Sequence, residues 1–353
     1  MKILTELNHN IKNLNNKFNL NIYNKSTNLN FTNIKDAQNH WNKIGKRKGY
    51  VFGEKGEHTL IKIILPTYNE ASLLRMWLDY YEKLIGLHNV IIFDNESDNP
   101  EVLKIFSDYR SRLLLIYTSK YYFDLESNKD PAFEKIIDTI KNECKFLTKL
   151  DTDEFLCYYD RINKKFDNNK LLSLLSTCEN NIGSIWLSNI YTKEIYNDCK
   201  NYRNYIKFEN LDLEKVFNNR DHFFNNNGKS IFLSNQTFSL DWGNHNRSRD
   251  VIFNNLICLH LYLGDIDNRY RNNLSTIQKE IRQKNISISE YDFNDIKNTL
   301  KKISEHKHIF TGSHHKAKFN YEYLENPNEF KKKFINNTKN FILTTIIKDT
   351  IEK

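Results

Sequence analysis

Between residues 60 and 151 the chain alternates short, continuous apolar runs with longer segments whose apolar positions recur every three or four residues. The continuous runs predict strands buried on both faces, and the periodic segments predict amphipathic helices. We expect strands at 60–66, 89–95, 112–118 and 145–151, with helices at 69–86, 100–110 and 131–143 between them. This order predicts βαβ units, and therefore an α/β fold with a mostly parallel sheet covered by helices on both faces.

The segments on either side have different patterns. Residues 1–58 are rich in asparagine and then show a short helical pattern that ends at Gly45, which predicts a helical N-terminal extension. Residues 266–353 contain basic helical stretches and predict a helical C-terminal region. We therefore divide the chain into an extension at 1–58, an α/β domain at 59–265 and a helical region at 266–353.

Polar residues collect where three of the expected strands end. The strings are "PTYNE" (66–70), "DNESDN" (94–99) and "DTDEF" (151–155). Ligands of open α/β sheets bind beyond the carboxyl ends of the strands. None of these strings is a phosphate loop or a Gly-x-Gly-x-x-Gly turn, which argues against P-loop NTPases and nicotinamide enzymes.

The last of these strings places Asp151, Asp153 and Glu154 directly after the apolar run "FLTKL". Like charges at the end of a buried strand need a counter-charge. Asp151 and Asp153 are two positions apart, so on an extended stretch both face the same side. A divalent cation bound by oxygen ligands suits this pattern, and a solvated acidic turn is the alternative.

Three strings in order, "LIKIILPTYNE", "VIIFDNESDN" and "KFLTKLDTDEF", resemble the GT-A glycosyltransferases of the family 2 type. The subgroup they resemble most carries an Asp-x-Asp-Glu-Phe string and shades into the family 92-like enzymes. Later strings resemble that subgroup too: "FNNR" (217–220), "GKSIF" (228–232) and "DWGNH" (241–245). The resemblance covers about residues 60–265. The helix at 131–143 departs from the subgroup, which has a glutamine and a Tyr-Asn string there.

The resemblance implies a Rossmann-like GT-A domain and a hexosyltransferase-type enzyme (EC 2.4). Such an enzyme moves a sugar from a nucleotide-diphosphate sugar, here expected to be a UDP-sugar, to a hydroxyl of a glycan or protein, with inversion. Mn²⁺ or Mg²⁺ would neutralise the leaving phosphate. The resemblance makes Asp153 the direct metal ligand, gives Asp151 a contact to the donor ribose or to the metal through water, and makes His245 the distal ligand. His260 is the alternative to His245.

Other site residues follow from the same resemblance. The turn after the first strand and the end of the second would bind the nucleotide through Thr67, Tyr68, Asn69, Glu70 and Asp94. Arg220 and Lys229 are candidates for the phosphates. For the general base that an inverting transfer needs, the candidates are Asp241, Asp221 and Glu214, with Asp241 preferred. Glu154 would orient the metal shell or the acceptor.

Composition adds limits. The net charge of +8, from 52 basic and 44 acidic residues, suits an anionic ligand, but without an arginine-rich block we expect no nucleic acid. Five irregularly spaced cysteines predict reduced thiols and a cytoplasmic protein. We expect no transmembrane segment, and leave peripheral membrane contact and oligomeric state open. The segment around Trp41 resembles an element found beside bacterial and viral glycosyltransferase domains, which suggests such an origin.

Two alternatives remain open at this point. A degenerate transferase fold could serve as a nucleic-acid-binding or scaffold protein, although the Asp151–Asp153 pair argues against it. A nucleotidyltransferase on a similar sheet would need a Gly-rich or Lys/Arg-rich loop after the first strand, and "PTYNE" is not such a loop.

Overall fold

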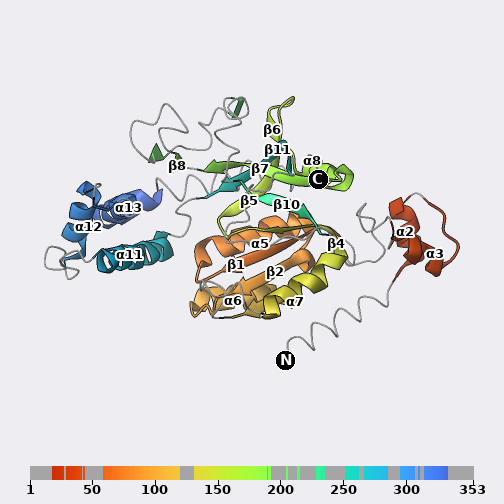
Figure 1. The fold of residues 1–353 in the computed structure, drawn as a ribbon, viewed down its shortest axis with the longest axis horizontal. Helices are drawn as coiled ribbons and strands as arrows, with labels where there is room; N and C mark the ends of the chain where they lie inside the picture. The colour runs from red at the N-terminus through yellow and green to blue at the C-terminus, as the bar shows by residue number, and fades with distance from the viewer. Residues whose placement is uncertain are drawn as a thin grey trace. The chain divides into compact units, whose positions relative to one another are not determined.

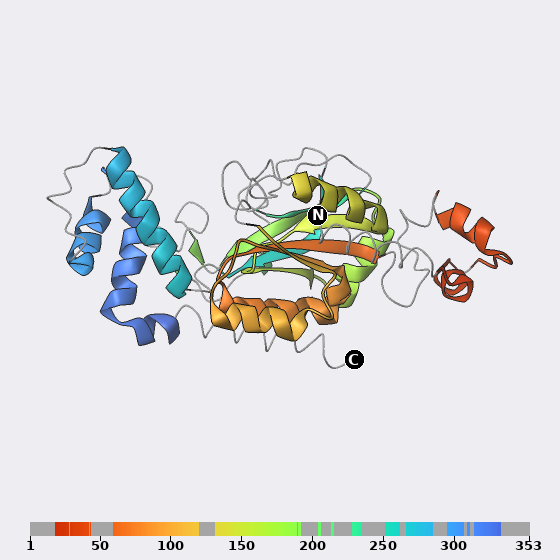
Figure 2. The same ribbon diagram turned by 90° about the horizontal axis from the view of Figure 1, so that it is seen from below.

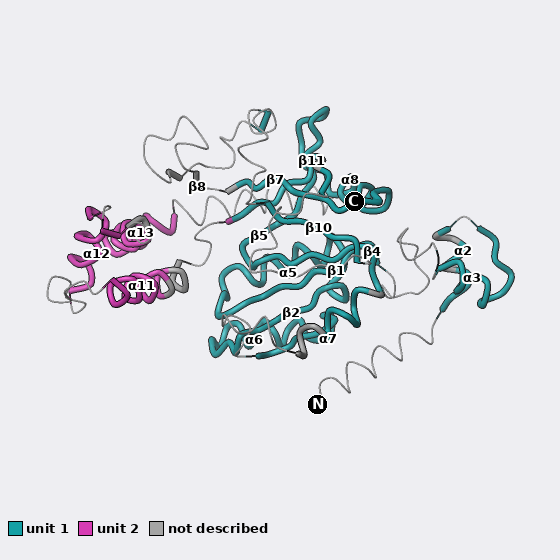
Figure 3. Tube along the Cα trace, in the orientation of Figure 1, with its two compact units in different colours: residues 1–187, 213–260, 346–353 teal, residues 188–212, 261–345 magenta. Residues whose placement is uncertain are grey.

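A computed structural model of the chain shows two compact units (Figure 3). Unit 1 comprises residues 1–187, 213–260 and 346–353, and unit 2 comprises 188–212 and 261–345. The residues that the structure describes are 18–27, 29–41, 43, 59–119, 131–188, 190–191, 204–205, 213–214, 228–234, 251–261, 266–284, 295–306, 309–310 and 314–332. The three-part division made from the sequence remains a prediction.

Unit 1 is built around a nine-stranded sheet with the order β3-β2-β1-β4-β10-β7-β11-β5-β6 (Figure 1). Its strands are β1 (Thr59–Thr67), β2 (Val90–Asp94), β3 (Leu115–Thr118), β4 (Cys144–Lys149), β5 (Glu154–Asp160), β6 (Lys165–Phe166), β7 (Asn181–Ser188), β10 (Ser230–Leu233) and β11 (Val251–His260). Its longer helices are α5 (Ala71–Ile85), α6 (Pro100–Tyr109), α7 (Pro131–Ile140) and α8 (Asn168–Thr177).

The first half of the sheet confirms the predicted α/β arrangement. β1 pairs in parallel with both β2 and β4, and β2 pairs in parallel with β3. Thr67 is opposite Asp94 and Ile64 is opposite Lys149, so these strands end at one edge. β3 begins later than predicted because the chain after α6 turns back on itself, with the Arg112 amide donating to the Tyr109 carbonyl at 2.9 Å.

The second half of the sheet is antiparallel, and its strands after β4 were not among the predicted elements. β10 pairs antiparallel with β4 and β7, and β5 pairs antiparallel with β11 and β6. This half matters for function because it brings distant parts of the sequence to the turn between β4 and β5. These parts are β11 and Lys229, the residue just before β10.

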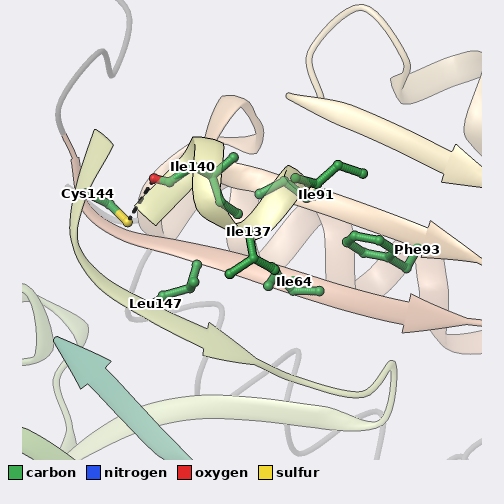
Figure 4. Packing of buried hydrophobic residues seen from close by; sticks show 8 residues of the cluster. Ile64, Ile91, Phe93, Ile137, Ile140, Cys144 and Leu147 are labelled. Atoms are coloured by element: carbon green, nitrogen blue, oxygen red, sulfur yellow. Dashed lines mark hydrogen bonds between the residues drawn. The ribbon is translucent and has the colours of Figure 1, made fainter. Parts of the chain in front are cut away.

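Helices cover both faces of the sheet, as the sequence predicted. Figure 2 shows α5 and α6 on one face and α7 on the other. The apolar face of α7 packs on β1, β2 and β4 through one buried cluster (Figure 4), made of Ile64, Ile91, Phe93, Ile136, Ile137, Ile140, Cys144 and Leu147. Truncating such an isoleucine to alanine lowers the free energy of unfolding by about 2–5 kcal/mol. The cluster fixes the strands whose ends carry the polar residues.

The helices α2 (Leu20–Thr27) and α3 (Ile34–His40) form a small element near the N-terminus. Asn33 caps α3 by accepting a hydrogen bond from the Asp36 amide at 2.8 Å. Tyr23 is buried, and its hydroxyl forms a 2.8 Å hydrogen bond with His40 Nδ1. The predicted stop at Gly45 lies outside the described residues.

Unit 2 contains α11 (Ile266–Gln283), α12 (Ile296–Glu305), α13 (His314–Glu325) and α14 (Pro327–Lys331), and also the short strands β8 (Ile190–Tyr191) and β9 (Asn204–Tyr205). An apolar cluster joins the first three helices and includes Ile277, Leu300 and Ala317. Asn273 donates to Asn320 at 3.2 Å, and both side chains are buried. The helical character predicted after residue 266 is therefore confirmed where the chain is described. Within those parts, none of the helices is both long and apolar enough to cross a membrane.

Candidate active site

The acidic string forms a turn between β4 and β5 rather than an extended stretch. The Glu154 amide donates to the Asp151 carbonyl at 3.0 Å, and the Asp151 amide donates to Glu154 Oε2 at 2.8 Å. The expectation of an extended stretch across Asp151 and Asp153 was therefore wrong. Asp153 and Glu154 are buried, whereas 43% of the Asp151 side chain is exposed.

Lys229 supplies the positive charge that the sequence required at this turn. Its Nζ lies 3.2 Å from Asp151 Oδ2 and 3.1 Å from Glu154 Oε2, and 1% of its side chain is exposed. Its backbone is fixed to β7, because its amide donates to Ser184 Oγ at 2.9 Å and its carbonyl accepts from the Ser184 amide at 3.0 Å. The ammonium is thus held inside the protein by both its main chain and its charge.

The charge states of this pair follow from burial and attraction. Burial raises the pKa of Glu154 to about 7, against the attraction of Lys229. Burial alone would lower the pKa of Lys229, but the negative charges of Glu154 and Asp151 raise it above its ordinary value. Lys229 therefore stays protonated at neutral pH.

Asp153 points to a different partner, the histidine at the end of β11. His260 Nε2 lies 3.4 Å from Asp153 Oδ2, and the register of the two strands places His260 directly opposite Glu154. The His260 ring also packs on Trp186 of β7, with ring centroids 5.1 Å apart. Among the described residues, the distant histidine at the acidic turn is therefore His260, the alternative from the sequence analysis.

Asp153, Glu154 and His260 have the composition of a metal centre. Each offers one ligand atom, and these atoms lie within 4.8 Å of one another. Carboxylate oxygens with one imidazole suit Mn²⁺, and carboxylates alone suit Mg²⁺. The residues present therefore fit a hard divalent cation.

Side chains of α5 hold the start of β5 in place. Trp77 Nε1 donates to the Glu154 carbonyl at 3.0 Å, and the Tyr81 hydroxyl accepts from the Leu156 amide at 2.9 Å. The Tyr80 hydroxyl donates to the Leu156 carbonyl. β5 pairs with β6 only near the end of β5. At the start of β5, these three side chains instead provide hydrogen-bond partners for its backbone groups. The helix thereby fixes the backbone that carries Glu154.

The loop after β1 is anchored to the loop after β2 by Asn69. Its backbone has φ 55°, a left-handed conformation that asparagine tolerates better than most residues. Its Oδ1 accepts from the amides of Asp98 at 3.0 Å and Asn99 at 2.9 Å, and its Nδ2 donates to Asp98 Oδ1 at 2.8 Å. Asn69 therefore shapes both strand-end loops, whereas Tyr68 beside it is exposed.

A direct contact joins the first strand-end loop to the acidic turn. The Thr152 hydroxyl donates to Glu70 Oε2, and Thr152 is fully buried. Glu70 is also the residue before α5, whose aromatic side chains hold β5. The strings after β1 and β4 are thus parts of one site.

Two buried polar side chains lie side by side at the ends of β1 and β2. Burial raises the pKa of Asp94, although hydrogen bonds from Ser97 oppose this shift. Thr67 is 1% exposed, and its Oγ1 has no hydrogen-bond partner among the residues that the structure describes. A buried hydroxyl in this state marks a place where a ligand can complete the hydrogen bonding.

The structure thus gathers Thr67, Asn69, Glu70, Asp94, Asp151, Asp153, Glu154 and Lys229 along one edge of the sheet. Arg220, Asp221, Asp241 and His245 lie outside the described residues, so their predicted roles remain predictions. Glu214, the other candidate base, accepts a hydrogen bond from Arg161 at 2.7 Å. The sequence analysis missed the anchoring role of Trp77, Tyr80 and Tyr81, although their spacing places them on one face of the helix.

No family model matches the chain, and no curated protein matches it significantly. Three similar solved structures are of TarS from S. aureus. The first is 20% identical, covers 37% of this chain and 22% of that one, and has a TM-score of 0.23. The second, TarS 1–349 in complex with UDP, is 17% identical over 37% of this chain and 36% of that one, with a TM-score of 0.24.

The third structure, TarS 1–349, is 11% identical, covers 79% of this chain and 89% of that one, and has a TM-score of 0.29. The chain thus spans well under half the length of the first two structures in their alignments. Identities and scores of this size assign no activity.

Proposed function

We propose that the protein is a glycosyltransferase that moves a sugar from a nucleotide-diphosphate sugar to an acceptor hydroxyl. The observation that carries this proposal is the hydrogen bond from the Thr152 hydroxyl to Glu70 at the sheet edge. It joins the loop after β1, which is expected to bind the nucleotide, to the acidic turn. One part of the site offers buried polar groups for a base and ribose, and the other offers ligands for a cation. A pyrophosphate bound between them would meet both.

In this proposal Asp153 and His260 bind a divalent cation, Mn²⁺ or Mg²⁺, with Glu154 within reach. When bound, the cation neutralises the negative charge that develops on the leaving phosphate. His245 is the second candidate for the histidine ligand. Asp151 is exposed enough to contact the donor ribose, or the cation through water, as the family resemblance implies.

The chain's own residues would bind and orient the donor. Thr67 Oγ1 and the Asp94 carboxylate would hydrogen-bond the nucleoside, with Tyr68 exposed beside them for stacking. Arg220 is a candidate for the phosphates. Asp241 would take the acceptor proton in an inverting transfer, with a UDP-sugar as the expected donor and a glycan or protein as the acceptor.

A screen of nucleotide sugars tests the proposal. Purified protein is incubated with UDP-, GDP-, CDP- and ADP-sugars, each with Mn²⁺, with Mg²⁺ and with EDTA, and release of the nucleoside diphosphate is measured. We expect release from at least one donor, UDP-sugars first, that stops in EDTA. Release that continues unchanged in excess EDTA would contradict the metal-dependent mechanism.

A further inference from the structure

Lys229 is a buried cation within a candidate site for another cation. Its ammonium contacts Asp151 Oδ2 at 3.2 Å and Glu154 Oε2 at 3.1 Å. Asp153, the remaining carboxylate of the turn, has its Oδ2 3.4 Å from His260 Nε2. The structure therefore separates the three carboxylates into two that Lys229 engages and one that faces the imidazole.

The charges of this cluster match a divalent ion. Asp151, Asp153, Glu154 and the Lys229 ammonium together carry two net negative charges when all three carboxylates are ionised and His260 is neutral. A buried cluster with a large unbalanced charge is costly, and a cation that balances it binds correspondingly well. Without Lys229 the same turn would carry one more negative charge than a divalent ion supplies.

We propose that Lys229 is a positioning residue that acts as the fixed counter-charge of the acidic turn. It engages Asp151 and Glu154, so that Asp153 and His260 remain as the ligands of the cation, and it sets the charge of the site for a divalent ion. This inference rests on the proposed function, and it differs from the sequence expectation that Lys229 contacts the phosphates. In this account Lys229 acts through the carboxylates.

Anchoring of Lys229 supports a fixed role. Ser184 Oγ donates to the Lys229 carbonyl at 2.8 Å and accepts from its amide at 2.9 Å, so the main chain cannot shift without losing both bonds. The next residue, Ser230, is joined to β4 by the Thr148 hydroxyl, which donates to its carbonyl at 2.8 Å. The lysine is therefore held by the strands on both sides of β10 and does not depend on a ligand for its place.

The test is a titration of Mn²⁺ alone, without nucleotide, followed by the electron paramagnetic resonance of the unbound ion. The variants are Glu154→Gln, Lys229→Met and the double variant. Glu154→Gln leaves one net negative charge and should weaken Mn²⁺ binding on the order of tenfold, the scale of a unit charge acting on a divalent ion in a partly hydrated site. The double variant restores two net negative charges and should return to within about threefold of the wild type.

Thermal unfolding keeps the test informative if a variant is unstable. Lys229→Met leaves Glu154 buried without its counter-charge and should lower the melting temperature by on the order of 10 °C. The double variant should recover most of this loss, because removal of both partners of a buried pair is often nearly neutral. It is therefore the variant in which Mn²⁺ binding can be measured on a folded chain.

Lys145 offers a matched control. It is a second buried lysine, with 0% of its side chain exposed, and it contacts Glu179 at 3.5 Å and the Ser176 carbonyl at 2.8 Å. It lies near the start of β4, whereas the acidic turn follows the end of that strand, about 20 Å away at about 3.3 Å per residue. Lys145→Met should lower stability and leave Mn²⁺ affinity unchanged.

The outcomes separate this inference from the proposed function. Weak binding in the double variant, equal to that of Glu154→Gln, would make Glu154 an indispensable ligand and overturn the counter-charge role. Equal Mn²⁺ affinity in the wild type and all variants would show a purely structural ion pair and also overturn it. Failure of the wild type to bind Mn²⁺ would instead contradict the proposed metal-dependent function, and this inference with it.

Discussion

His260 Nε2 lies 3.4 Å from Asp153 Oδ2, although the two residues are more than one hundred positions apart in the chain. The antiparallel pairing of β11 with β5 produces this contact, with His260 opposite Glu154. The contact defines the centre of the site, because an imidazole and a carboxylate at this distance can bind one cation between them.

Replacing Asp153 with asparagine should abolish metal-dependent turnover. The amide keeps the shape of the side chain but removes the charge, and a direct ligand should matter at least as much as supporting residues, whose loss costs about 10–100-fold. The melting temperature should stay within a few degrees of the wild type, since two nearby carboxylates then repel less. Donor turnover and thermal unfolding measure the two effects, and near-normal turnover would remove Asp153 from the site.

His260→Ala should weaken Mn²⁺ binding by about 10–100-fold and reduce its pH dependence. Only neutral imidazole binds a metal, so the affinity of the wild type should fall as the solution is acidified, and the variant should lose part of that fall. His88→Ala is the control, because His88 is exposed and lies just before β2, at the end of that strand away from the site. If His245→Ala has the larger effect, His245 is the ligand.

Tyr81→Phe should destabilise unit 1 by about 1–3 kcal/mol, the cost of leaving a buried polar group without its partner. The hydroxyl accepts from the Leu156 amide at 2.9 Å, and burial raises the pKa of Tyr81 so that it stays neutral. Denaturant unfolding measures the loss. Tyr158→Phe is a suitable control, because among the described residues its hydroxyl makes just one long contact, 3.5 Å from Asn255 Nδ2. An equal loss in both variants would contradict a special role for Tyr81.

Asp160 gives a prediction about acid stability at a place away from the site. Hydrogen bonds from Lys170 and Asn163 hold the pKa of Asp160 to about 2. A lowered pKa means that Asp160 adds stability above its unfolded value, near 3.9, and loses it as the pH falls towards 2. The melting temperatures of the wild type and Asp160→Asn should therefore differ at pH 5 and converge near pH 2. A difference that stays constant over this range would contradict the ion pair.

Several features of the fold and of the candidate site could be predicted from the sequence. The alternation of apolar runs and helical segments from residue 60 predicted the parallel strands, because each signal is local and β1, β2 and β4 are buried along almost their whole length. The acidic turn was visible for the same reason. Asp151, Asp153 and Glu154 are adjacent in the sequence, and so many carboxylates after an apolar strand required a cation.

The identity of that internal cation was beyond the sequence. Lys229 reaches Glu154 only because β10 joins the sheet antiparallel between β4 and β7, and no local pattern shows such a pairing. His260 was the alternative to His245 in the sequence analysis, and its place opposite Glu154 depends on the register of β11 with β5. Pairings between distant strands therefore bring Lys229 and His260 to the acidic turn, and His245 remains the other candidate for the histidine ligand.

The most direct test of the central claim is the binding of nucleoside diphosphates, measured by isothermal titration calorimetry with UDP, GDP, CDP and ADP. Each titration is made in Mn²⁺ and in EDTA, with the wild type and with Asp153→Asn. We expect at least one nucleotide, UDP first, to bind the wild type in Mn²⁺, and to bind much more weakly in EDTA or to the variant. Absence of binding by all four in Mn²⁺, or equal affinity in EDTA, would contradict the account.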